Sequence, residues 1–141
     1  MMISQTAEYA LRAVVWLGGR PDESVGTKQI SQVAQVPAGY LPKVLQMLGR
    51  AGLVISTPGR SGGFRLARRP EEISVLDVIN AVDPIQRIHE CPLHLKGHGT
   101  ELCPLHRRLD NAMAQMEKAF AQSTVAEMLA EKTESPPLLE L

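Results

Sequence analysis

Residues 27–66 read TKQISQVAQVPAGYLPKVLQMLGRAGLVISTPGRSGGFRL. The first part places apolar residues at helical spacing behind Thr27, whose hydroxyl we expect to cap the first turn. A break at Pro37 precedes a second helix, expected over residues 37–51 with its start between Pro37 and Leu41, and Gly52 is placed to end it. Two short helices joined by a tight break predict a helix-turn-helix.

A β-hairpin is expected directly after the second helix. Residues 53–56 and 64–67 have β-like sequences, and the Gly- and Pro-rich residues between them favour a turn. A hairpin in this position is the wing of a winged helix-turn-helix. We therefore expect the wing over residues 56–66.

Helical patterns extend on both sides of this unit. Residues 4–19 form an amphipathic pattern behind a plausible N-cap at Ser4, and a shorter helix is expected behind Ser74. A long helix is expected from Pro104 to about Gln122. Its apolar stripe comprises Leu105, Leu109, Met113, Met116 and Phe120. Such a stripe favours packing against a second copy of the chain, the alternative being that it folds back on its own N-terminal domain.

The expected fold class is mainly α, a winged helix-turn-helix with a two-stranded wing and a long C-terminal dimerisation helix. The expected divisions are a DNA-binding domain at 1–83, a Cys/His-rich sensor loop at 84–104, a dimerisation helix at 105–132 and a flexible tail at 133–141.

The zero net charge of the 141 residues hides a division between the two halves. Residues 1–70 hold nine basic and three acidic residues, whereas residues 71–141 hold six and twelve. A basic first half is suited to a polyanion such as double-stranded DNA.

DNA contacts are expected from three places. The start of the first helix of the pair is suited to phosphates, the second helix to the major groove, and the wing to the minor groove. Small residues at the start of the second helix allow close approach, and Lys and Gln can read guanine and adenine. The expected contacts are Thr27, Lys28, Ala38, Gly39, Tyr40, Lys43, Gln46, Arg50, Arg60, Ser61 and Gly62. We expect a homodimer on a pseudo-palindromic operator.

All four His and both Cys lie within residues 89–106, in two Cys-Pro-Leu-His units that begin at Cys91 and Cys103. This clustering favours a metal site or a redox site. Zinc could be held by Cys91, His94, Cys103 and His106. The two thiols could also act as a redox pair without metal.

Three stretches carry a family resemblance: EYALRAVVWL, ISQVAQVPAGYLPKVLQMLGRAGLV and STPGRSGGFRLARRPEEISVLDVINAVD. Together they resemble the winged-helix regulators that include IscR, NsrR and CymR (the Rrf-two superfamily). The resemblance implies a winged helix with a long dimerisation helix. It also implies, for many members, sensing of iron–sulfur status, redox state or nitric oxide. Other members carry no cluster and sense metabolites or partner proteins.

The resemblance also implies a ligand set for a cluster. Iron–sulfur members place three cysteines in this loop, and Cys91 and Cys103 match the outer two, whereas Gly97 stands at the middle position. A cluster, expected as 2Fe-2S, would need another ligand here; the candidates are His106, His94, His98 and Glu8. Glu8 is included because some relatives recruit an acidic residue of the first helix from the other subunit.

Other classes fit less well. No Gly-rich phosphate loop, nucleophile elbow or pair of catalytic carboxylates accompanies the Cys and His residues, so neither an enzyme nor a small-molecule substrate is expected. A protein-binding adaptor is disfavoured by the basic first half. The expectation is a cytoplasmic protein, since the N-terminus lacks the pattern of a signal peptide and no stretch suggests a membrane span. The operator, the regulated genes and the direction of regulation do not follow from the sequence.

Overall fold

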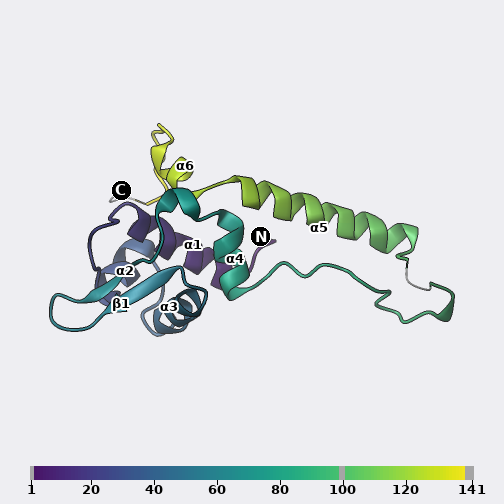
Figure 1. The fold of residues 1–141 in the computed structure, drawn as a ribbon, viewed down its shortest axis with the longest axis horizontal. Coiled ribbons are helices and arrows are strands. Elements are labelled where there is room, and N and C mark those ends of the chain that lie inside the picture. The colour runs from purple at the N-terminus through teal and green to yellow at the C-terminus, as the bar shows by residue number, and fades with distance from the viewer. Residues whose placement is uncertain (1, 99–100, 139–141) are drawn as a thin grey trace.

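The computed structural model describes residues 2–98 and 101–138 and consists of a helical body with a projecting arm (Figure 1). The elements in chain order are α1 (Gln5–Gly18), α2 (Thr27–Ala34), α3 (Leu41–Arg50), β1 (Val54–Thr57), β2 (Gly63–Leu66), the 3-10 turn η1 (Pro70–Glu72), α4 (Val75–Val82), the 3-10 turn η2 (Lys96–His98), α5 (Pro104–Gln122) and α6 (Val125–Ala130). The predicted mainly helical winged-helix architecture is confirmed.

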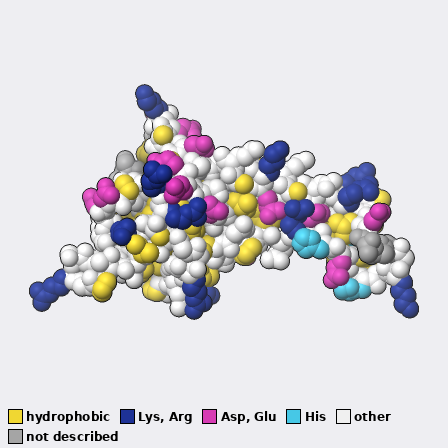
Figure 2. Space-filling model, in the orientation of Figure 1, with side chains coloured by type: hydrophobic (Ala, Val, Ile, Leu, Met, Phe, Trp, Pro, Cys, Tyr) yellow, Lys and Arg dark blue, Asp and Glu magenta, His cyan; other side chains and the backbone are white. Residues whose placement is uncertain are grey.

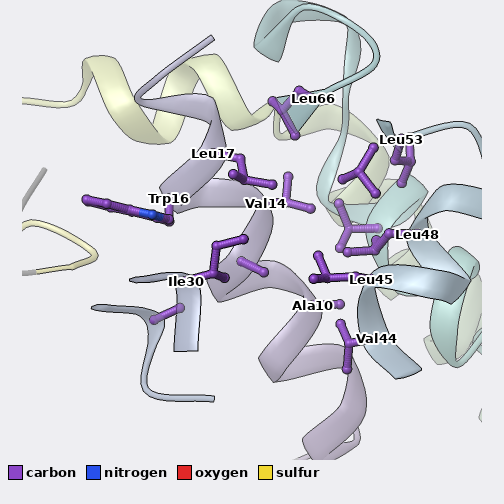
Figure 3. Close-up of a cluster of buried hydrophobic side chains, with 14 of the residues drawn as sticks. Ala10, Val14, Trp16, Leu17, Ile30, Val44, Leu45, Leu48, Leu53 and Leu66 are labelled. Carbon is purple, nitrogen blue, oxygen red and sulfur yellow. The ribbon is translucent and has the colours of Figure 1, made fainter. Parts of the chain in front are cut away.

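Helix α1 runs through the centre of the body. Ser4 caps it as predicted, since its side chain accepts a hydrogen bond from the Ala7 N–H at 3.1 Å. The inner face of α1 meets side chains from α2, α3 and the wing in one continuous core (Figure 3). Its fully buried large members include Trp16, Leu17, Ile30, Leu41, Leu45, Leu48 and Leu53. Burial of these aliphatic side chains is the main stabilising term of the body.

The helix-turn-helix forms as expected, with one difference at the helix starts. The N-cap of α2 is Gly26 and no side-chain cap bond is present, so the predicted cap by Thr27 is wrong: Thr27 is already the first helical residue. Helix α3 starts at Leu41, the last position of the region between Pro37 and Leu41 in which its start was expected. Proline is tolerated at Pro42 because the first turn of a helix needs no N–H there.

The wing follows α3 without a spacer. Gly52 ends the helix as predicted: its φ is +76°, and the Leu53 N–H donates to the Leu48 carbonyl at 3.0 Å, as in a Schellman motif. Strands β1 and β2 pair antiparallel, with Val54 opposite Leu66. The hairpin is the predicted wing.

Helices α4 and α6 start side by side. Ser74 and Thr124 each form a capping box, with Asp77 and Glu127, and the two caps form an isolated antiparallel bridge. The long helix predicted from Pro104 to about Gln122 is α5, and the expected dimerisation segment 105–132 contains a second helix, α6. The second capping box begins the new helix and stops the first.

Helix α5 and the loop before it form the arm (Figure 1). No residue of α5 is buried; the side chains of Leu105 and Leu109 are 61% and 45% exposed. In the part of the chain that the structure describes, no helix is both long and apolar enough to cross a membrane.

Candidate functional site

The outward face of α3 is polar, as the helical spacing predicts. Lys43, Gln46 and Arg50 are exposed, while Leu41 and Leu45 on the opposite face of the helix are buried. Four further predicted contacts, Thr27, Lys28, Ala38 and Gly39, are also exposed. The last two precede α3 and lie in the turn that leads into it, so the small residues flank the helix start instead of forming it.

Tyr40 is held by the body of the domain. Its hydroxyl lies 2.6 Å from the Thr6 hydroxyl, and its ring meets the Tyr9 ring edge to face, with centroids 5.4 Å apart. Its place at the N-cap of α3 means that these contacts fix the start of the helix on α1. Tyr40 therefore positions the start of α3 on α1, a role that the sequence did not predict.

The turn between α2 and α3 is fixed from α1 as well. Gln35 adopts a left-handed conformation with φ of +52°, and its carbonyl accepts a hydrogen bond from Arg12 Nη1 at 3.1 Å. Arg12 also forms an ion pair with Glu8 at 3.1 Å. One guanidinium thus joins the first helix to the turn that sets the angle of α3.

The wing is joined to the body by a third short strand segment. The Val25 N–H donates to the Phe64 carbonyl and the Phe64 N–H donates to the Val25 carbonyl, both at 2.8 Å. At Gly63 a Cβ would lie 2.4 Å from the Val25 oxygen, and at Gly62 it would lie 2.0 Å from the Thr57 oxygen. The backbone approach that shapes the wing requires glycine at both positions.

The loop of the wing presents a basic side chain. Arg60 and Ser61 are exposed between the two strands, whereas Gly62 is half-buried. Figure 2 shows Lys and Arg side chains over the wing and over the far end of the arm. In Figure 1 the wing and α3 lie on the same side of the body.

One pair of predicted metal ligands comes together. The Cys103 Sγ lies 3.2 Å from His106 Nδ1, because Cys103 is the N-cap of α5 and His106 follows within its first turn. Both side chains are half-buried. A thiol and an imidazole at this distance can share a hydrogen bond or bind one metal ion together.

The other candidate ligands are placed differently. Cys91 is half-buried, and His94, exposed and with φ of +53°, donates its N–H to the Cys91 carbonyl at 3.0 Å. Glu8 is engaged with Arg12, and the side chain of His98 lies outside the described residues. Within the described ranges, no group of three His, Cys, Asp or Glu side chains is arranged to hold a metal ion.

Sulfur and imidazole donors suit both a 2Fe-2S cluster and zinc, so the Cys103–His106 pair fits either group. A 2Fe-2S cluster or a zinc ion takes more than two protein ligands. Among the described residues of one chain, no third ligand lies beside Cys103 and His106. The pair is therefore part of a candidate metal centre.

A cluster of charges that the sequence analysis missed ties the loop to α5. Arg87 donates to both carboxylate oxygens of Asp110, at 2.7 and 2.8 Å, and to Glu117 at 2.9 Å. The Ile88 N–H donates to Asp110 at 2.9 Å. These hydrogen bonds, first those from Arg87, lower the pKa of Asp110 to about 2. The spacing of Asp110 and Glu117 along one helix face was the only sequence signal, and it named no partner.

A family model described as "Iron-dependent Transcriptional regulator", Rrf2, matches residues 3–131. The HTH-type transcriptional regulators NsrR of Halalkalibacterium halodurans and of Geobacillus kaustophilus are 28% and 29% identical to the chain. The first match covers 100% of this chain and 99% of the relative, and the second match covers 99% of this chain and 97% of the relative.

Solved structures share the fold. The global cysteine regulator CymR of B. subtilis superposes with a TM-score of 0.77 at 24% identity, covering 94% of this chain and 99% of that one. The IscR of T. potens superposes with a TM-score of 0.76 at 23% identity, covering 96% and 94%. At these identities the likeness concerns the winged-helix fold with its projecting helix.

Proposed function

Since the chain belongs to the Rrf2 family of transcriptional regulators and is a DNA-binding winged helix, we propose that it acts as a homodimer on a pseudo-palindromic operator. In this proposal α3 enters the major groove and the wing enters the minor groove. The loop before α5 senses redox or iron–sulfur status. An enzymatic role is set aside, because the relatives are named as regulators.

The observation that carries the DNA-binding mode is the polar face formed by α3 and the wing. Lys43, Gln46 and Arg50 face outward from a helix whose opposite side is locked in the core, and Arg60 is exposed in the wing loop. A rigid helix with outward donors can read base edges, while a basic loop can follow the backbone or the minor groove. Thr27 and Lys28 are exposed at the start of α2, and in this proposal they contact phosphates.

Selection of bound fragments from random DNA tests this mode, because it needs no knowledge of the operator. We expect two half-sites about 10 base pairs apart, or a multiple of that. Gln46→Ala should relax the preference at one position of each half-site, whereas Arg60→Ala should weaken binding and its salt dependence. Lys118→Ala, an exposed basic residue of α5, is the control. Equal behaviour of all three variants would refute the assignment.

The support for a homodimer is the exposed stripe of α5. A helix of 19 residues that buries no side chain leaves Leu105 and Leu109 in water, beside half-buried Met113 and Met116. Packing against a second α5 would remove this apolar surface from solvent. Light scattering of Leu109→Asp tests it: we expect a monomer where the parent protein is a dimer. Asn111→Asp, an exposed polar position of the same helix, is the matched control.

The support for a sensing loop is the Cys103–His106 pair at the start of α5. In the proposal these two residues and Cys91 hold a 2Fe-2S cluster, with a last ligand from His94, His98 or the partner's copy of Glu8. Such a cluster would supply a one-electron redox change. The same pair also favours a second candidate, a regulator with a structural zinc or a thiol-redox site in which Cys91 and His94 complete the set.

Purification without oxygen, followed by a visible spectrum and by iron, sulfide and zinc analysis, separates these candidates. Iron matched by sulfide supports the cluster; zinc alone supports the second candidate. Cys103→Ala and His106→Ala should each lower the metal content, whereas His89→Ala, an exposed histidine of the same loop, should not. Metal content unchanged in all three variants would refute both the cluster and the zinc site, and an unchanged reactivity of the Cys91 and Cys103 thiols under oxidising and reducing conditions would refute the thiol-redox site.

A further inference from the structure

The chain returns to the helix-turn-helix after α6. Pro136, Pro137 and Leu138 line a cavity of about 190 Å³ whose other walls come from α1 and the end of α2, namely Arg12, Val33, Ala34 and Gln35. Leu138 is half-buried and packs against the main core. The end of the described chain therefore lies in a groove of the DNA-binding domain.

The segment lies against walls that are partly apolar, at Val33 and Ala34, and partly polar, at Arg12 and Gln35. Pro136 and Pro137 line the groove but are exposed, and each has a fixed φ and no N–H, so they lie there with little loss of entropy and without an unpaired donor. The preceding residues 131–135 are exposed and act as a spacer. Leu138 supplies the apolar side chain that the groove partly buries.

The wall of the groove is the turn between α2 and α3. The Gln35 carbonyl accepts from Arg12, the Val36 N–H donates to the Ser31 carbonyl at 3.1 Å, and the Ser31 hydroxyl donates to the Val36 carbonyl at 2.6 Å. A ligand that contacts both Arg12 and Gln35 restrains this turn. Since the turn joins the two helices of the helix-turn-helix, it also sets where α3 begins.

We propose that the groove between α1 and α2 is a binding site for a short Pro-Pro-Leu peptide, and that residues 136–138 of the same chain are its ligand. Seating of this segment holds the Gln35 turn. The cavity of about 190 Å³ that remains beside it means that the segment fills the groove incompletely. A weak contact is sufficient, because a tethered segment has an effective concentration in the millimolar range.

Nuclear magnetic resonance of the full chain carrying Leu138→Asp tests the inference without any DNA. Charge at this position should expel the segment, shift the amide signals of Arg12 and residues 33–36, and speed their hydrogen exchange about threefold or more. The amides of α4 and α6 should stay in place and report that the body is folded. The matched control is Leu93→Asp, at a leucine that is 67% exposed in the loop of the arm.

A peptide of residues 134–138, added at millimolar concentration to the Leu138→Asp protein, should return these signals toward their original positions. The same peptide with Asp in place of leucine should not. If Leu138→Asp impairs folding, Leu138→Ala replaces it, with the same expected shifts. Unmoved signals at Arg12 and residues 33–36, or a peptide that causes no saturable shift, would overturn the inference.

Discussion

Replacing Gly63 by alanine should detach the wing from the body. The new Cβ would lie 2.4 Å from the Val25 oxygen and 2.5 Å from its carbonyl carbon, and both atoms are backbone atoms that cannot rotate away. Gly63 also has φ of +150°, which an L side chain rarely adopts. The chain must therefore separate Val25 from Phe64.

The magnitude follows from what is lost. Two backbone hydrogen bonds of 2.8 Å join Val25 and Phe64. At about 1 kcal/mol each they account for roughly 2 kcal/mol, and backbone strain at position 63 adds about 1 kcal/mol. A loss of about 3 kcal/mol should lower the melting temperature of a domain of this size by roughly 10 °C.

Thermal unfolding followed by circular dichroism measures this loss. Gly97→Ala is the control, because a Cβ at Gly97 would meet no described atom within 4 Å and the φ there is not positive. Its melting temperature should change little. Equal melting temperatures for Gly63→Ala and Gly97→Ala would refute the argument that close approach at Val25 shapes the wing.

In the DNA assay, Gly63→Ala should also weaken binding by about as much as Arg60→Ala, because both remove the wing contact.

Three other changes have defined outcomes. Leu45→Ala should cost about 2–5 kcal/mol in urea unfolding, because this core side chain is only 1% exposed. Tyr40→Phe should cost about 1 kcal/mol in the same assay by removing the 2.6 Å bond to Thr6, and a lower midpoint with an unchanged slope would confirm it. Asp110→Asn should remove an acid-dependent part of stability. The pKa of Asp110 is depressed to about 2, so its pairing with Arg87 stabilises the fold fully above about pH 4 and is lost toward pH 2. An acid titration of Asp110→Asn that matches the parent protein throughout this range would contradict this pairing.

The parts of the fold that the sequence predicted depend on neighbours in sequence. The Ser4 cap, the Ser74 cap and the end of α3 at Gly52 each follow from residues within one turn of the helix end. The bounds of α5 were predicted because Pro104 can start a helix and its apolar stripe is regular. Such local signals need no knowledge of the tertiary contacts.

Two errors at helix ends were also local and could have been avoided. Thr27 was taken as a cap because its hydroxyl is suitable, yet Gly26 occupies the cap position. The Thr124-x-x-Glu127 pattern is a capping box, and it divides the region predicted as one helix. In both cases the deciding residues lie within one helical turn of the helix start.

The missed contacts join residues far apart in the chain. Arg87 pairs with Asp110 and Glu117, and Tyr40 with Thr6, across segments whose relative position depends on the whole fold. No residue spacing predicts such partners. The candidate metal site shows the same division between local and distant contacts. Cys103 and His106 meet because they share one helical turn, which the sequence can predict. The position of Cys91 relative to them depends on the long loop, which the sequence cannot predict.

Helix α4 packs against both the arm and α3. Helix α4 packs against α1, α3 and α5, and its first residues form the bridge to α6 through Ser74 and Thr124. The loop before α5 is held on α5 by the ion pairs of Arg87 with Asp110 and Glu117. Val78 and Ile79 of α4 are buried in the core, so α4 cannot shift without disturbing the side chains packed around it. Because α4 packs against α5 and also against α3, we expect a movement of the arm to reach α3 through α4.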